Sequence, residues 1–189
     1  MSAMHYWNAS WDLNLDLCPC DLHFMEWVKA EKIKGKVIYH FGTGTHHLVG
    51  VENLKNGEPN FFVGVTASPG ETEAFTRMAI EEPRLSRNYT MHFGDIYLFN
   101  GKLLPKFDIA TMFHLCEFWS EKNSAYGGMN DEEVLRKVIK QMKKNGRIVF
   151  YEGSDGWAKT KPIVAKLAKE GLFTKTGQHK KLPVYTVNS

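Results

Sequence analysis

VIYHFGTGTHHLVG, residues 37–50, is the stretch that decides the fold. The apolar run 37–41 is typical of a buried strand, and Gly42-Thr43-Gly44 is typical of the tight turn that follows one. Glycines in such a turn let backbone N–H groups approach a ligand closely where the next helix begins. Because any sharp strand-to-helix turn favours glycine, this turn becomes informative only together with the patterns that follow it.

Strand and helix patterns alternate along the rest of the chain. Apolar runs predict strands at 37–41, 61–65, 89–93, 107–113 and 147–151. The spacing of apolar residues predicts helices at 21–33, 46–54, 71–82, 130–142 and 161–169. Asp21 could cap the first of these, and Asn145-Gly146 is predicted to end the fourth. Residues 172–173 and 184–187 lack a full helix between them, which predicts an antiparallel pair. The chain is therefore predicted to adopt an α/β fold with a mainly parallel sheet and right-handed crossovers.

Composition is that of an ordinary globular domain. The 189 residues are 43% hydrophobic and 24% charged, with a net charge of +3, which predicts one domain with a buried core. We divide it into a helical or lid segment, residues 1–34, and an α/β core, residues 35–189. No run is apolar enough to suggest a signal peptide or a membrane span, so we predict a cytoplasmic protein without a membrane partner. The lysine-rich turns indicate solvated surface rather than a nucleic-acid partner, and the oligomeric state is not predicted.

Cysteines and histidines offer two possible metal sites. Cys18-Pro19-Cys20 followed by His23 could clip a metal, although this spacing is unlike that of common zinc sites and no second cysteine pair follows. Five histidines fall near the predicted ligand-binding edge, and they could bind a metal, act as bases or simply pack and cap: His40, His46, His47, His92 and His114. We predict no metal at either place.

Five segments in order resemble the class I S-adenosylmethionine-dependent methyltransferase family. They are the glycine turn at 42–44, GVTASP at 64–69, FGDI at 93–96, FDIA at 107–110 and MKKNGRIV at 142–149, with Asn145 where proline is usual. The resemblance extends from about residue 20 to the C-terminus. It implies a Rossmann-like methyltransferase fold: a mainly parallel, seven-stranded twisted sheet with helices on both faces and an antiparallel hairpin at the C-terminal edge.

The resemblance also implies S-adenosylmethionine as cofactor, held at the carboxyl ends of the first four strands. The glycine turn would pass under the methionine part, with Thr66 beside the ribose and Ala67 beside the adenine. Asp95 would accept a hydrogen bond from the adenine amino group, and the backbone of Ile96 would donate one. The implied cofactor-binding residues are His40, Gly42, Thr43, Gly44, Thr66, Ala67, Gly94, Asp95, Ile96 and Phe113.

Two positions lack an acid that the family pattern usually has, and a third lacks a glycine. His40 stands two residues before the turn, and Thr66 ends the second strand, where the family usually has acids. His46 stands at the position where the family's turn has its third glycine. Losing a charged acceptor for the ribose hydroxyls costs on the order of 1–3 kcal/mol of binding energy.

The function implied is methyl transfer to a small molecule, with His114 as catalytic base or positioner. Met112-Phe113-His114-Leu115 replaces the Asn-Pro-Pro-Tyr-like tetrapeptide expected for transfer to a base amine or a glutamine amide. Candidate substrate-binding residues, several of which could equally pack or stay solvated, are Tyr6, Trp7, Trp11, Glu117, Trp119 and Glu152. The alternatives are a binding or regulatory protein that keeps the fold without methyl transfer, and different chemistry with the same cofactor or a relative.

Overall fold

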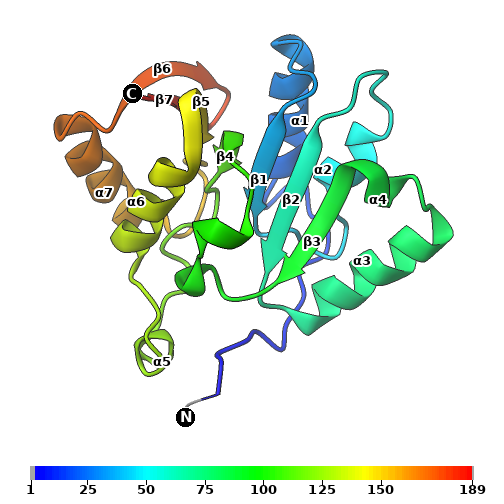
Figure 1. Cartoon of the computed structure of the whole chain (residues 1–189), viewed down its shortest axis with the longest axis horizontal. Coiled ribbons are helices and arrows are strands. Elements are labelled where there is room, and N and C mark those ends of the chain that lie inside the picture. The colour runs from blue at the N-terminus through cyan, green and yellow to red at the C-terminus, as the bar shows by residue number, and fades with distance from the viewer. Residues whose placement is uncertain (1–2, 189) are drawn as a thin grey trace.

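The computed structural model describes residues 3–188, which contain a seven-stranded sheet in the order β3-β2-β1-β4-β5-β7-β6 (Figure 1). Strands β1 to β5 are parallel, and β7 pairs antiparallel with both β5 and β6. The strand order reverses between β1 and β4, which is where open α/β sheets place a ligand crevice. The strands are β1 Val37–Phe41, β2 Phe61–Thr66, β3 Tyr89–Phe93, β4 Phe107–Thr111, β5 Met142–Val149, β6 Phe173–His179 and β7 Leu182–Val187.

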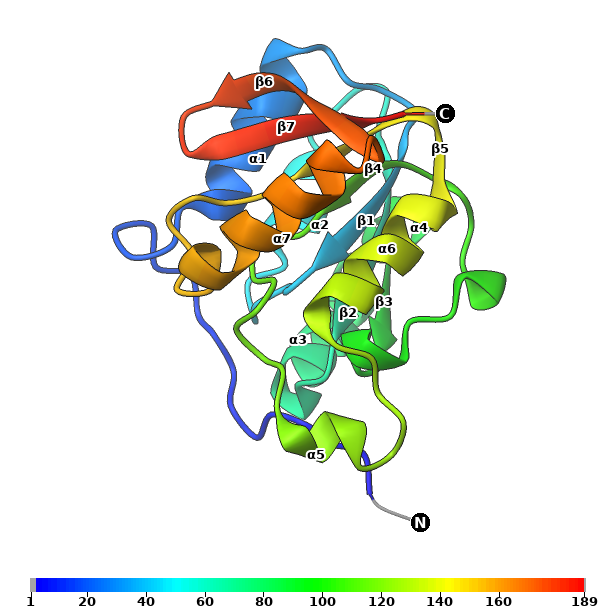
Figure 2. The same ribbon diagram turned by 90° about the vertical axis from the view of Figure 1, so that its left-hand side faces the viewer.

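Helices cover both faces of the sheet (Figure 2). Figure 2 shows α6 and α7 together on one face, with α1 on the other. The helices are α1 Cys20–Ala30, α2 Leu48–Asn53, α3 Pro69–Glu81, α4 Leu85–Asn88, α5 Glu121–Ser124, α6 Asp131–Gln141 and α7 Trp157–Lys169, with short 3₁₀ turns η1 Ile96–Leu98 and η2 Gly101–Leu103. The predicted fold, including the antiparallel C-terminal edge, is confirmed.

Two apolar cores lie on opposite faces of the sheet because successive strand side chains point to opposite sides. Tyr39 and Ile148 pack with α6 and α7 in one core. Ile38 and Val149, each next to one of these in the chain, pack with α1, α2 and α4 in the other. Strands buried on both faces therefore read as continuous apolar runs, as the sequence pattern indicated.

Several predicted boundaries are wrong, and those between α6 and β5 and at the start of α7 have identifiable causes. Asn145 and Gly146 do not end the helix before β5: that helix ends at Gln141, and β5 begins at Met142. Asn145 has a φ of 59°, and the pairing of β5 with β4 shifts between Phe107 and Ile109, so the dipeptide lies in an irregular part of the strand. Helix α7 begins four residues before the predicted Lys161, because Thr160 Oγ1 donates to the carbonyl of Leu115 at 2.8 Å and anchors the first turn.

The segment before α1 crosses the carboxyl ends of the parallel strands (Figure 1). The backbone N–H of Trp7 donates to the carbonyl of Ala67 at 3.1 Å, and that of Thr45 donates to the carbonyl of Trp11 at 2.8 Å. Ser68 Oγ donates to the carbonyl of Ala9 at 2.6 Å. These bonds hold the segment against the ends of β1 and β2. In residues 3–188 we find no helix with the length and apolar character needed to cross a bilayer.

Candidate functional site

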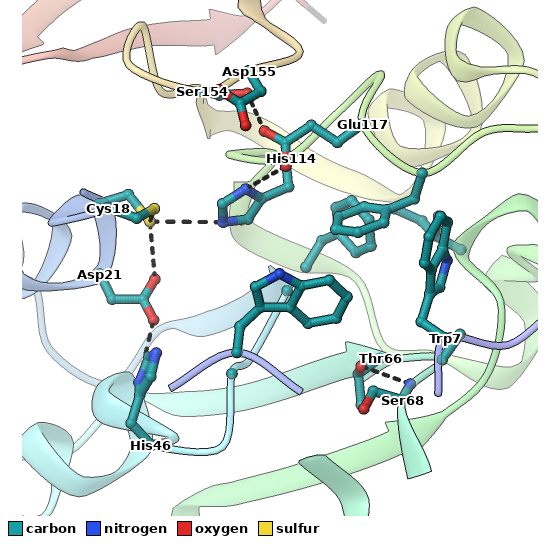
Figure 3. Close-up of a pocket in the computed structure, with 18 of the residues that line it drawn as sticks. Trp7, Cys18, Asp21, His46, Thr66, Ser68, His114, Glu117, Ser154 and Asp155 are labelled. Atoms are coloured by element: carbon teal, nitrogen blue, oxygen red, sulfur yellow. Dashed lines mark hydrogen bonds and ion pairs between the residues drawn. The ribbon is translucent and has the colours of Figure 1, made fainter. Parts of the chain in front are cut away.

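A cavity of about 490 Å³ lies at the carboxyl ends of β1 to β4, beneath the N-terminal segment (Figure 3). Its volume is in the usual range of small-molecule sites, roughly 300–1,000 Å³. Each of the four strands contributes a residue to its wall just at or beyond its end: Gly42, Thr66, Asp95 and His114. The sheet thus brings together residues that are far apart in the sequence.

The glycine turn after β1 forms one wall, and its glycines are required by geometry. Gly42 and Gly44 have φ of 85° and 58°, values that side chains disfavour. A Cβ on Gly42 would lie 2.8 Å from Cδ2 of His114, and one on Gly44 would lie 2.9 Å from the carbonyl oxygen of Trp11. The turn is therefore packed between His114 and the N-terminal segment.

Thr66 and its neighbours form the wall at the end of β2. Thr66 Oγ1 accepts a hydrogen bond from the backbone N–H of Ser68 at 3.0 Å. Ser68 in turn caps α3, because its Oγ accepts from the backbone N–H of Glu71. Thr66, Ala67 and Ser68 all line the cavity. This wall offers hydroxyls and a helix start rather than a carboxylate.

Asp95 follows β3 and is largely committed to other protein groups. Its Oδ1 accepts from the backbone N–H of Tyr97 at 2.9 Å. Its Oδ2 accepts from Asn123 Nδ2 at 2.8 Å and from the Tyr126 hydroxyl. A carboxylate oxygen has two acceptor sites, so Oδ1 keeps one for a ligand in the cavity.

Glu71, on α3, is a buried carboxyl that the sequence reasoning missed. Its side chain lies beneath the glycine turn, and its Oε2 accepts from Thr43 Oγ1 at 3.0 Å. Burial raises the pKa of the Glu71 carboxyl, against the opposing effect of hydrogen bonds from Thr66 and Thr43. The sequence around Glu71 gives no sign that its side chain is buried, since this burial depends on how α3 packs against the glycine turn.

A second cluster joins the start of α1 to the loop after β4 (Figure 3). Cys18 Sγ lies 3.4 Å from Cys20 Sγ, and Cys20 Sγ lies 3.8 Å from His114 Nε2. On the other side of its ring, His114 Nδ1 lies 3.0 Å from Glu117 Oε2. The hydrogen bond from Cys20, helped by His114, holds the pKa of the Cys18 thiol well below its ordinary value. The pKa of the Cys20 thiol is raised by that same bond and by burial.

His114 and Glu117 form an ion pair at the edge of the cavity. Burial lowers the pKa of His114, but Cys18 and Glu117 outweigh burial, so that the net shift is upward. Burial raises the pKa of the Glu117 carboxyl, and His114 with Ser154 reverses that shift. The cavity wall therefore carries fixed charges of both signs close together.

Asp21, the second residue of α1, is buried beside the histidines. Its Oδ1 lies 3.6 Å from His40 Nε2, and its Oδ2 lies 3.9 Å from His46 Nδ1. Burial would raise the pKa of Asp21, but His40, His46 and His114 outweigh burial and lower it. The predicted capping role of Asp21 is wrong, since Pro19 stands at the N-cap of α1 and no side chain caps this helix. Nothing in the spacing of Asp21 shows that α1 packs against the end of β1.

Aromatic rings close the cavity on the side of the N-terminal segment. Trp7 and Trp11 both contact Phe118 edge-on, with ring centroids 5.2 and 5.4 Å apart respectively. Phe118 follows β4, so these contacts tie the segment to the far side of the cavity. Edge-to-face pairs of this kind add to the stability of the contact beyond simple burial.

The structure groups many, but not all, of the predicted site residues. Those that line the cavity are Trp7, Trp11, Gly42, Gly44, Thr66, Ala67, Asp95, Ile96, His114 and Glu117. Those that do not line it are Tyr6, His40, Thr43, Gly94, Phe113, Trp119 and Glu152. His40 bonds Thr111 in the interior, Phe113 packs between Phe24 and Tyr151, and Glu152 accepts from Gln178. His92 is exposed on β3, and His23 does not join the cysteines.

Comparison with known proteins identifies the fold. No protein-family model matches the chain, and no curated protein matches its sequence. Magnesium protoporphyrin IX methyltransferase from Synechocystis PCC 6803, solved with bound S-adenosylmethionine, matches 90% of this chain and 79% of its own. The TM-score is 0.59 and the sequence identity 12%. This chain has the class I methyltransferase fold.

Other structures with the methyltransferase fold have different activities. The ribosomal protein L11 methylase from Lactobacillus delbrueckii subsp. bulgaricus matches 94% of this chain and 80% of its own, with a TM-score of 0.57 and 12% identity. The cyclase SpnF matches 93% of this chain and 65% of its own, with a TM-score of 0.60 and 15% identity. A fold shared by activities this different does not identify an acceptor.

Proposed function

We propose that this chain is an S-adenosylmethionine-dependent methyltransferase that acts on a small-molecule acceptor. The observation that carries the proposal is the cavity itself, which lies at the switch point of the sheet and is lined from the ends of four consecutive parallel strands. Bound S-adenosylmethionine would supply an electrophilic methyl group. The protein's share of the work is to bind, orient and exclude water.

The residues present fit this cofactor, with weaker polar contacts than the family pattern has. Thr66 Oγ1 and the remaining acceptor site on Asp95 Oδ1 are available to hydroxyl and amino groups. Gly42 and Gly44 line the cavity, so the backbone of the turn can contact a ligand there. Asp21, a buried carboxylate that lines the same cavity, would supply negative charge that favours a cation such as the sulfonium.

A small acceptor is favoured by the way the N-terminal segment covers the cavity. Trp7 and Trp11 leave a space bounded by rings and by His114 and Glu117. A flat organic molecule would fit between such rings, whereas a large polymer would have to displace the segment. His114 is the proposed positioning or catalytic group there, since Glu117 holds its Nδ1 and fixes the direction of Nε2.

Isothermal titration calorimetry with S-adenosylmethionine and S-adenosylhomocysteine tests the proposal. We expect one site, weakened by Thr66→Ala and more strongly by Asp95→Asn, which removes charge while keeping the shape. His92→Gln, on an exposed ring outside the cavity, is the matched control. Absence of binding at millimolar concentrations of both ligands would overturn the proposal.

A second candidate is a protein that binds a ligand in this cavity without methyl transfer. It is favoured by His40 and Thr66 in place of acids and by the engagement of Asp95 with Asn123 and Tyr126. The two candidates differ in turnover. With a labelled methyl group and a panel of phenols, amines and thiols, transfer supports the first candidate, and tight binding without transfer to any member supports the second.

A further inference from the structure

Three potential metal ligands converge on one point of the cavity wall. The Sγ atoms of Cys18 and Cys20 and a ring nitrogen of His114 all lie within 4.8 Å of one another. Cys18 precedes α1, Cys20 begins it, and His114 follows β4, so the cluster joins segments 94 residues apart. All three side chains line the cavity.

The spacing of these atoms matches a tetrahedral zinc site. With Zn–S bonds of about 2.3 Å and Zn–N bonds of about 2.0–2.1 Å, ligand atoms lie about 3.8 Å apart for two sulfurs and about 3.5 Å for sulfur and nitrogen. The observed separations are 3.4 Å between the sulfurs and 3.8 Å between Cys20 Sγ and His114 Nε2. Small side-chain shifts would therefore place a cation between them.

The imidazole of His114 is held as metal-bound histidines usually are. Glu117 Oε2 lies 3.0 Å from Nδ1, which leaves Nε2 facing the sulfurs. Glu117 is itself fixed, because its Oε1 accepts from Ser154 Oγ (Figure 3). A carboxylate that bonds the far nitrogen of the ring orients the ligand and raises its basicity.

Charge also favours a divalent cation at this place. On binding a divalent cation, the two thiols and His114 would release their protons to solvent. The two thiolates and the neutral imidazole would then balance a charge of two, which makes such a centre compatible with a partly buried wall. Asp21 Oδ1 lies 3.7 Å from Cys20 Sγ, so its carboxylate would add negative charge close to the cation. Among residues 3–188, three ligands converge, which is the pattern of sites that keep one exchangeable position.

We propose that Cys18, Cys20 and His114 bind one thiophilic divalent cation, with zinc as the reference ion, and that its fourth position opens into the cavity. This differs from the expectation drawn from sequence, which considered His23 as the partner of the cysteines and predicted no metal. The folded chain supplies His114 instead. The site would accept a soft or anionic donor such as a thiolate or phenolate at the open position.

One use of the ion rests on the proposed function. An acceptor thiol or phenol bound to a divalent cation ionises more readily, and would thus face the methyl group as an anion. The cation site itself does not depend on methyl transfer. Metal binding and cofactor binding can therefore be measured independently, and either proposal can be contradicted without the other.

Cobalt(II) titration of the full chain, reduced and handled without oxygen, tests the site. We expect one equivalent to bind with a thiolate-to-cobalt charge-transfer absorption, and zinc to displace it. Cys18→Ser, Cys20→Ser and His114→Gln should each weaken binding, and the two serine variants should lower the absorption. Glu117→Gln should keep the absorption while weakening affinity roughly 10- to 100-fold.

Cys116→Ala is the matched control, since this third cysteine is buried outside the cavity. It should bind cobalt as the unmodified chain does. Far-ultraviolet circular dichroism and cooperative melting check that each variant folds. No cobalt binding, or binding that keeps its full thiolate absorption in both serine variants, overturns the metal site, whereas loss of S-adenosylhomocysteine binding alone overturns only the proposed function.

Discussion

Gly42 shows how the absence of one side chain shapes the cavity. Its φ of 85° is open to glycine and costly for other residues, and the ring of His114 fills the space where a Cβ would be. Gly35 has a similar φ of 61°, but no atom lies within 4 Å of the place that its Cβ would take. Alanine at Gly35 would therefore add backbone strain alone, whereas alanine at Gly42 would add strain and a steric clash.

Replacing Gly42 by alanine should destabilise the fold more than the same change at Gly35. We expect Gly35→Ala to cost about 1–2 kcal/mol of unfolding free energy, from backbone strain. Gly42→Ala should cost about 2–4 kcal/mol, because overpacking against His114 adds to the strain. Urea denaturation of both variants measures this, and equal losses would contradict the assigned contact.

His47 is a buried residue whose protonation should govern part of the acid stability. Its Nδ1 accepts from the Tyr89 hydroxyl at 2.7 Å, and its Nε2 donates to the carbonyl of Glu71 at 2.8 Å. Burial lowers the pKa of His47 to about 4, from 6.5 when exposed. The unfolded chain thus takes up this proton more readily than the folded one.

Stability should therefore fall as the pH drops below about 6.5 and the His47 contribution should level off near pH 4. The full contribution is about 3 kcal/mol. His47→Asn, whose side chain tolerates the φ of 42° at this position, cannot take up the proton. Its stability deficit relative to the unmodified chain should shrink between pH 7 and pH 5 in denaturant titrations, and a constant deficit would rule out this role.

At the scale of elements, the segment before α1 is the part that turns an open sheet edge into a cavity. It has little regular structure, and it is held by backbone hydrogen bonds to residues after β1 and β2 and by ring contacts to Phe118. Its two tryptophans line the cavity, whereas Trp119 lies outside it. This contrast provides a matched test of the lid.

Trp7→Ala and Trp11→Ala should each weaken binding of S-adenosylhomocysteine by roughly 10-fold, since about 1.4 kcal/mol of ring contact and enclosure is lost. Trp119→Ala should leave the dissociation constant within about twofold. Calorimetry on the three variants makes the comparison. A Trp119 effect as large as the other two would place the cover of the cavity elsewhere.

At the scale of the whole molecule, the site depends on the sheet joining distant segments. Reversal of strand order between β1 and β4 puts the glycine turn beside the loop that carries His114. A ligand that bridges the ends of several strands binds only the folded chain, so binding and global stability are linked.

Saturating S-adenosylhomocysteine should therefore raise the melting temperature. At a concentration 100 times the dissociation constant, the gain is about 2.7 kcal/mol. For a chain of this size, that corresponds to a rise of roughly 5–10 °C. Differential scanning calorimetry over a series of ligand concentrations measures it, with adenosine as the control for weaker occupation; a melting temperature independent of ligand would contradict the proposed site.

Sequence alone determined the fold and the position of the strand ends that line the cavity. Apolar runs and glycine turns located the parallel strands and their ends, because strand burial and sharp turns impose local patterns on the residues themselves. The sequence placed Gly42, Thr66 and Asp95 at the ends of strands, and the structure has all three in the cavity wall. The errors at Asn145 and at the start of α7 arose where a distant partner, rather than the local pattern, set the boundary.

Only the tertiary structure decided which side chains share the cavity. It turned His40 and Phe113 into the interior, engaged Asp95 with Asn123 and Tyr126, and brought Glu71 beneath the turn. It also exchanged His23 for His114 as the histidine beside Cys18 and Cys20. The physical reason is that strand direction and helix packing bring together residues such as Cys20 and His114, which are 94 positions apart. No local periodicity records such contacts.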